Sequence, residues 1–194
     1  MRGLILLGLC ALSAVGCSQV LVKAPVGDSP LSIEASEWEG DWLALTPDQD
    51  EFETISIKVA DADRGMIRVF VVQDGKVQAA DVHLRQAGPD VFASTLKAEP
   101  RSLGRFIFLG RVIKRENAIF VWAPDMGRFR RLVAQGQLRA SSTANDRTGD
   151  VVLESLGSAD LAMVSSPEIL FQWDKPTVLV RPHAVRSDER QPPP

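Results

Sequence analysis

Short segments of alternating apolar and polar residues, separated by tight turns, place the strongest constraint on the fold of this chain. Residues 54–59 put Ile55, Ile57 and Val59 on one side of an extended segment, a pattern typical of a half-buried strand. Asp74-Gly75 follows the β-branched and aromatic segment 66–73. This dipeptide favours a hairpin, because both central residues of a type I′ turn need positive φ.

The same criteria predict a series of strands along the chain. They cover residues 38–45, 54–59, 66–73, 76–86, 91–97, 106–114, 118–123, 151–154 and 177–181. Strands at this spacing indicate an antiparallel meander, either closed as a barrel or folded as a sandwich. We expect a mainly β fold of about eight or nine strands, in which strands that are neighbours in sequence pair antiparallel.

One or two short helices should accompany the strands. Apolar residues recur at helical spacing over 126–135, with Asp125 as the N-cap and Gly136 as the stop. A second helix is expected over 158–164, capped by Ser158. The strand segments 106–109 and 119–122 are apolar on both faces, so the two helices are expected to cover them.

The chain divides into four parts on composition. Residues 1–16 form a predicted signal peptide, because Met1-Arg2 precedes an uncharged apolar run that is too short to span a bilayer. Residues 17–37 have no sustained period and contain several Pro and Gly, which predicts a tether. Residues 38–182 form the β domain, and the charged and Pro-rich residues 183–194 are predicted to be disordered.

Ala14-Val15-Gly16-Cys17 resembles the lipobox of bacterial lipoproteins, in which small residues precede a Cys that is acylated and becomes the mature N-terminus. The resemblance implies lipidation of Cys17. Cleavage after Gly16 without lipidation is the alternative, since Ala14 and Gly16 also satisfy the rule for ordinary signal peptides. Acylation would remove the one thiol left after cleavage, because Cys10 lies in the signal peptide.

The lipobox resemblance also implies a location. In the lipoprotein pattern an Asp after the acylated Cys is associated with retention in the inner membrane, and this chain has Ser18 there. The expected place is therefore the bacterial cell envelope, lipid-anchored to the outer membrane and facing the periplasm. The membrane would be a partner through the lipid anchor.

Gly40-x-Trp42 on the first predicted strand and Arg181 on the last resemble the lipocalin and calycin barrels. In those families the Trp plugs one end of the barrel and a basic side chain packs across its ring. The resemblance implies that the meander closes as a lipocalin-like barrel of about eight or nine strands and that Trp42 and Arg181 form a structural pair. From strand alternation alone two arrangements stay open, because Arg181 points inward if Leu179 does, and into solvent if Val178 and Val180 face the core.

The residue types that carry common chemistries are missing or badly placed. The chain has 22 basic and 25 acidic residues and a net charge of −3, which argues against nucleic acid as a partner. His83 and His183 are its two histidines, and they build neither a zinc site nor a hydrolytic triad. Asp61-x-Asp63 begins like a calcium loop, but Met66 stands where that loop needs Gly. We therefore expect no enzyme activity, no metal and no cofactor.

Two functions remain. The β domain binds an apolar ligand or envelope component, or it is a non-catalytic scaffold that docks on another cell-envelope protein. An apolar cavity of about 300 Å³ or more would favour ligand binding, and a packed interior would favour the scaffold.

Overall fold

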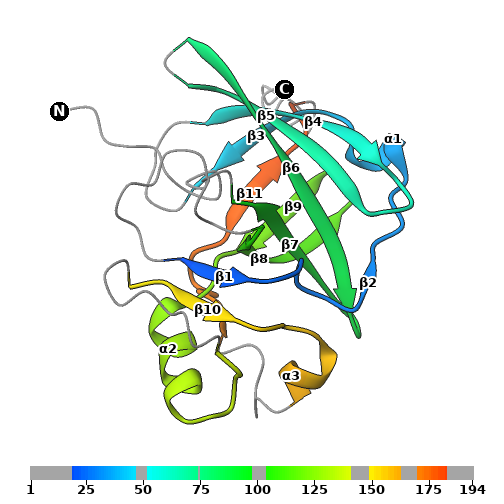
Figure 1. The fold of residues 1–194 in the computed structure, drawn as a ribbon. Coiled ribbons are helices and arrows are strands. Elements are labelled where there is room, and N and C mark those ends of the chain that lie inside the picture. The colour runs from blue at the N-terminus through cyan, green and yellow to red at the C-terminus, as the bar shows by residue number, and fades with distance from the viewer. Residues whose placement is uncertain are drawn as a thin grey trace, which may run out of the picture.

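The computed structural model describes residues 19–46, 52–73, 75–97, 104–140, 149–162 and 170–182. Cys17, Asp74, His183 and the tail 183–194 lie outside these residues. The described chain is mainly β, with eleven strands and three short helices (Figure 1).

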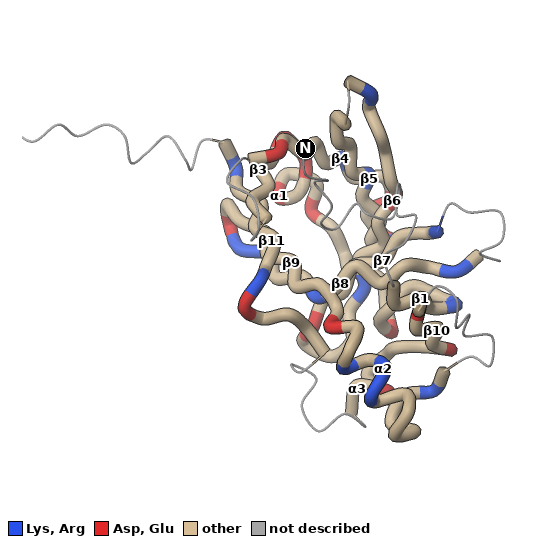
Figure 2. Tube along the Cα trace, turned by 90° about the vertical axis from the view of Figure 1, so that its left-hand side faces the viewer, with Lys and Arg blue, Asp and Glu red and all other residues tan. Residues whose placement is uncertain are grey.

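Eight strands form a closed antiparallel barrel. Each pairs with its neighbours in the order β3-β4-β5-β6-β7-β8-β9-β11, and the pairing of β11 with β3 closes the ring. The strands are β3 (Gly40–Leu45), β4 (Glu53–Asp61), β5 (Met66–Gln73), β6 (Lys76–Ala87), β7 (Asp90–Leu96), β8 (Phe106–Arg115), β9 (Ala118–Trp122) and β11 (Thr177–Val180). Figure 2 shows them around a ring. The predicted mainly β barrel is confirmed, and the sandwich is excluded.

A second layer packs outside the barrel against β7 and β8. It contains β1 (Val20–Val22), β10 (Val151–Leu153), α2 (Met126–Ala134) and α3 (Ser158–Ala162). Both predicted helices are present, and the side chain of Asp125 accepts a hydrogen bond from the Arg128 N–H at the start of α2. Phe108 of β8 meets Phe129 of α2 edge to face, with ring centroids 6.1 Å apart. The helices thus cover the outer face of β8, as expected.

The prediction of a tether over 17–37 is wrong for the residues that the structure describes, 19–37. Strand β1 pairs with β10 and β8, and Val20, Leu21 and Val22 are all buried. The chain then adds β2 (Ser29–Pro30) to β6 and forms the single-turn helix α1 (Ala35–Trp38). The β domain therefore includes residues 19–37 and does not start at 38, because apolar residues between the Pro and Gly residues, such as Val26 and Ile33, are buried against the barrel.

The wall formed by β7 and β8 separates two hydrophobic cores. On β7, Phe92 points outward into the second layer and Ala93 points into the barrel. A β-bulge beside Gly110 shifts the register between β7 and β8. Gly110 has φ +139°, and a Cβ there would clash with the carbonyl oxygen of Trp122. The position therefore requires glycine, since L side chains rarely adopt this φ.

Candidate functional site

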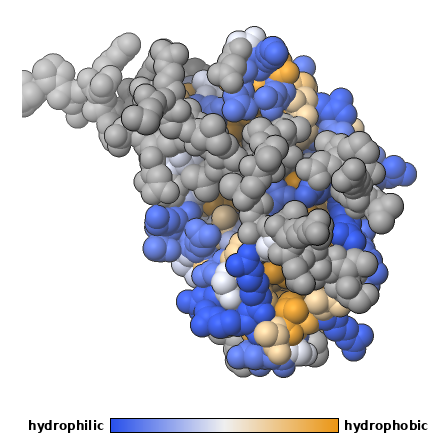
Figure 3. All heavy atoms as spheres, turned by 60° about the vertical axis from the view of Figure 1, so that its left-hand side comes forward, coloured by the Kyte–Doolittle hydropathy of each residue, from blue (hydrophilic) through white to orange (hydrophobic). Residues whose placement is uncertain are grey.

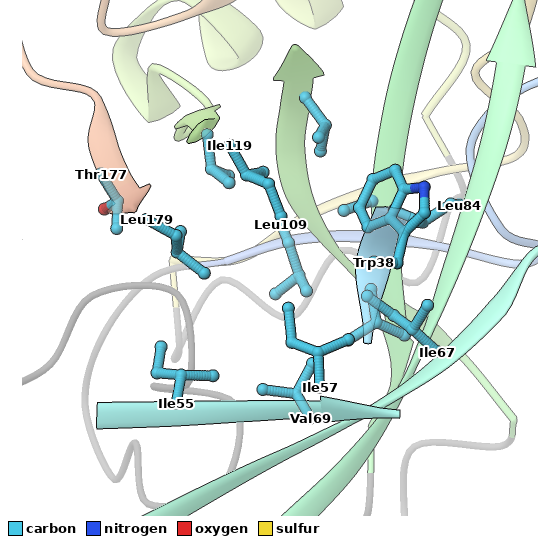
Figure 4. A pocket seen from close by; sticks show the side chains of 14 residues that line it. Trp38, Ile55, Ile57, Ile67, Val69, Leu84, Leu109, Ile119, Thr177 and Leu179 are labelled. Atoms are coloured by element: carbon cyan, nitrogen blue, oxygen red, sulfur yellow. The ribbon is translucent and has the colours of Figure 1, made fainter. Parts of the chain in front are cut away.

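An apolar cavity of about 110 Å³ lies inside the barrel. Figure 4 shows side chains from opposite walls that point into it, Ile55 and Ile57 from β4 and Leu109 from β8 among them. Every lining residue is apolar except Thr177. The lining residues are Trp38, Ile55, Ile57, Ile67, Val69, Val82, Leu84, Ala93, Leu109, Val112, Ile119, Val121, Thr177 and Leu179.

Strand alternation explains why the cavity is apolar. Successive side chains of a strand point to opposite faces, and on β4 and β5 the inward positions carry Ile55, Ile57, Ile67 and Val69. Such a lining offers dispersion contacts and almost no hydrogen bonds. The cavity can hold an apolar group, and its chemistry gives no means of orienting a polar one.

Trp42 closes one end of the barrel. Its side chain is 0% exposed, and its indole N–H donates to the carbonyl oxygen of Trp38 at 3.0 Å. The bond satisfies the polar atom of a side chain that is otherwise buried in the barrel core. The end of the barrel that carries α1, Trp42 and Arg181 is called the plugged end below.

The structure places Arg181 across the ring of Trp42. The guanidinium carbon lies 4.4 Å from the ring centroid, within the range of a cation–π contact. The guanidinium also donates to the carbonyl oxygens of Ser36, Glu37 and Glu39, at 3.3, 2.9 and 2.7 Å. Leu179 is buried in the barrel, which corresponds to the inward of the two arrangements that alternation leaves open.

Arg181 also caps α1. The last carbonyl groups of a helix have no partner within the helix, and a cation near that end is favourable. Helix α1 has no basic residue in its last turn, so Arg181 supplies the positive charge from the far end of the chain. One side chain therefore joins the first barrel strand, the last barrel strand and α1.

Sequence reasoning missed Trp38. The sequence places it at the start of the first strand, but the structure places it in α1, 5% exposed and lining the cavity. The signal was weak, because a single helical turn has no periodicity. Trp38 forms the wall of the cavity toward the plugged end.

His83 and Asp81 lie on the outer face of β6. Asp81 accepts two hydrogen bonds from Arg68, which lower the pKa of its carboxyl group. His83 packs edge to face on Phe106, with ring centroids 5.2 Å apart, and burial lowers its pKa. These contacts account for Asp81 and His83 as residues of the outer surface of the sheet. Within the described ranges, no three His, Cys, Asp or Glu residues come together as metal ligands.

The described helices are all too short or too polar to cross a bilayer. The sequence-predicted site residues thus divide into two groups: the structure brings Trp42 and Arg181 together, and Cys17 lies outside the described residues. No protein-family model, curated protein or solved structure matches this chain.

Proposed function

We propose that the protein is a lipid-anchored lipoprotein of the bacterial cell envelope whose barrel binds one slim apolar group, such as the end of an acyl chain. The apolar cavity carries the ligand-binding part of this proposal. A β-barrel is compatible with a ligand-binding role, and the interior of an eight-stranded barrel is wide enough to hold one small ligand where side chains do not fill it.

The size of the cavity limits the ligand. Pockets for drug-sized molecules measure about 300–1,000 Å³, and the cavity here is about 110 Å³. An apolar protein cavity of about 150 Å³ can bind benzene. A single hydrocarbon chain end suits this space, whereas a bulky ring system does not.

Ligand binding can be tested by filling the cavity. The inward-facing Ala93 lines it, so Ala93→Leu places additional carbon atoms in the empty space. We expect the wild-type protein to enhance the fluorescence of cis-parinaric acid, a slim polyene fatty acid, and Ala93→Leu to lose this enhancement. Ala79→Leu is the matched control, because Ala79 is exposed on β6. Equal binding by wild type and Ala93→Leu would refute binding in this cavity.

The scaffold is the second candidate, and the cavity volume favours it. A volume below that of ordinary ligand pockets means that much of the barrel interior is filled by its own side chains. If cis-parinaric acid binds to neither wild type nor Ala79→Leu, while both remain folded, the scaffold is the better account.

Lipidation of Cys17 is the separate part of the proposal. Its support is the lipobox-like Ala14-Val15-Gly16-Cys17. The test is mass spectrometry of the mature N-terminus after expression in a bacterial host. We expect an acylated Cys17 and a protein that fractionates with membranes, and Cys17→Ser should stay uncleaved or become soluble. An unmodified mature chain that begins at Cys17 or Ser18 would refute lipidation.

A further inference from the structure

Exposed apolar side chains gather at the end of the barrel opposite the plugged end. At this end β3 leads to β4, β5 to β6, and β7 to β8. Of the six large apolar side chains that are exposed in the described residues, five lie at these strand ends, and we call this the apolar end. The five are Leu45 at 37% exposure, Phe52 at 51%, Val72 at 64%, Val77 at 69% and Leu96 at 52%.

The register of the strands turns these residues away from the barrel interior. Val72 and Val77 are opposite one another in the β5–β6 hairpin, and Val71, the neighbour of Val72, belongs to the barrel core. The same alternation puts Leu45 outward, next to the inward Ala44. Figure 3, which brings the left-hand side of Figure 1 forward, shows hydrophobic surface in separate places, near the top and near the bottom of this face, among hydrophilic residues.

The first described residue is tied to this same end. The backbone N–H of Gln19 donates to Asp150 Oδ1 at 2.8 Å, and Asp150 Oδ2 lies 3.9 Å from Lys97 Nζ. Lys97 directly follows Leu96, where β7 ends. The carbonyl oxygen of Gln19 accepts from the N–H of Val151 at 2.9 Å. Gln19 is therefore fixed to the folded domain near the apolar end.

The covalent chain leaves little distance between Gln19 and Cys17. One residue, Ser18, separates them, so their Cα atoms are at most about 7 Å apart. A lipid on Cys17 would hold Gln19 within that distance of an anchor residue at the membrane surface. Residues 20–22 are a buried strand and not a tether, so they cannot extend and let the domain move away from the membrane.

We propose that the apolar end of the barrel lies directly against the lipid bilayer. This inference rests on the proposed lipidation of Cys17. Insertion of outward-facing Val72 and Val77 into the bilayer surface removes apolar area from water. The lipid anchor holds the apolar end close enough to the bilayer for this insertion. The plugged end, closed by α1, Trp42 and Arg181, faces away from the membrane.

Single cysteines at the two ends provide the test. Acylation blocks Cys17 and cleavage removes Cys10, so an added cysteine is the only reactive thiol in the mature full-length protein. Val77→Cys marks the apolar end. Glu116→Cys is the matched control, because Glu116 is an exposed turn residue beside Asn117, whose carbonyl oxygen accepts from the Arg181 N–H at the plugged end. Each carries an NBD fluorophore, and the proteins are reconstituted into phosphatidylethanolamine–phosphatidylglycerol vesicles that contain doxyl-labelled lipid.

We expect the probe at position 77 to emit at shorter wavelength and to be quenched several-fold more strongly by the doxyl lipid than the probe at 116. If the acylated protein stays on the vesicles while both probes remain in water, the orientation is refuted and the anchor stands. If Cys17 is unmodified and the protein does not fractionate with the vesicles, both the anchor and the inference fail. Mass spectrometry of the same samples separates the two failures.

Discussion

The contact between Arg181 and Trp42 gives the sharpest prediction about stability. Replacing Arg181 by Met keeps the aliphatic stem, removes the cation from the indole and removes three hydrogen bonds, two to carbonyl groups of α1 and one to the carbonyl group of its C-cap residue Glu39. Hydrogen bonds to charged groups contribute about 1.5–3 kcal/mol each. Arg181 is partly exposed, so water replaces part of that contribution, and we expect Arg181→Met to lower the free energy of unfolding by about 2–3 kcal/mol in total.

A double-mutant cycle isolates the contact with the ring. The second substitution is Trp42→Leu, which keeps an apolar side chain but removes the aromatic face. The four proteins share the Cys17→Ser background, and urea unfolding followed by circular dichroism gives their free energies of unfolding. We expect a coupling energy of about 0.5–2 kcal/mol, the range of a cation–π contact from exposed to desolvated sites.

A control separates this effect from the loss of any surface charge. Arg115→Met removes an exposed Arg at the end of β8, and it should change the free energy of unfolding by less than about 0.5 kcal/mol. A coupling energy within error of zero between Trp42 and Arg181 would refute the contact. An effect of Arg181→Met as small as that of Arg115→Met would refute the capping of α1 as well.

Three further predictions concern other parts of the fold. Val22→Ser should lower the free energy of unfolding by about 2–3 kcal/mol because β1 is buried. Ala24 is exposed, so Ala24→Ser should lower it by almost nothing; equally small effects of both substitutions would support the predicted tether. Gly110→Ala should cost about 3 kcal/mol or more, since it adds a clash with the Trp122 carbonyl to an unfavourable φ, and an unchanged urea midpoint would contradict the bulge. His83 has a lowered pKa in the folded protein, so the unfolded chain binds the proton more readily and stability falls as the pH drops below the ordinary value of 6.5. In His83→Gln this part of the pH dependence should disappear, and an identical pH profile of urea midpoints would show that His83 is not its source.

The barrel strands could be predicted because their signals are local. Alternation such as that of Ile55, Ile57 and Val59, and the turn signal at Asp74-Gly75, place strands and hairpins without knowledge of distant contacts. Each hairpin then pairs neighbouring strands, and such a meander becomes a barrel when its first and last strands pair. The helix after Asp125 was equally accessible, because a cap, a period and a stop occur within twelve residues of one another.

The missed elements depend on contacts far along the chain. Strand β1 has three residues, too few for a period, and it pairs with β10 about 130 positions away. Trp38 is a buried residue of the single-turn helix α1, and Arg181 caps the end of this helix. Arg181 directly follows the four-residue strand β11 and could face either way, and only the register of β11 against β3, with Val180 opposite Leu43, fixes its direction.

The position of Ser94 shows how closely the N-terminal segment is joined to the barrel. Its side chain is 0% exposed, and its hydroxyl oxygen accepts from the Val26 N–H at 3.1 Å. The segment after β1 therefore crosses the outer face of β7, and the N–H of the buried Val26 has a hydrogen-bond partner there. A sequence pattern dominated by Pro and Gly does not reveal such a contact.

The two hydrophobic cores on either side of the β7–β8 wall have a consequence for how this protein can change over time. The outer core, with Phe92, Phe108 and Phe129, makes its own contribution to the stability of the folded chain. Destabilising substitutions inside the barrel, at positions such as Ala93 or Leu109, are therefore offset in part by the stabilisation that the outer core supplies. A lineage can reshape the inner cavity for a different apolar group while the outer core keeps the fold above the threshold for folding.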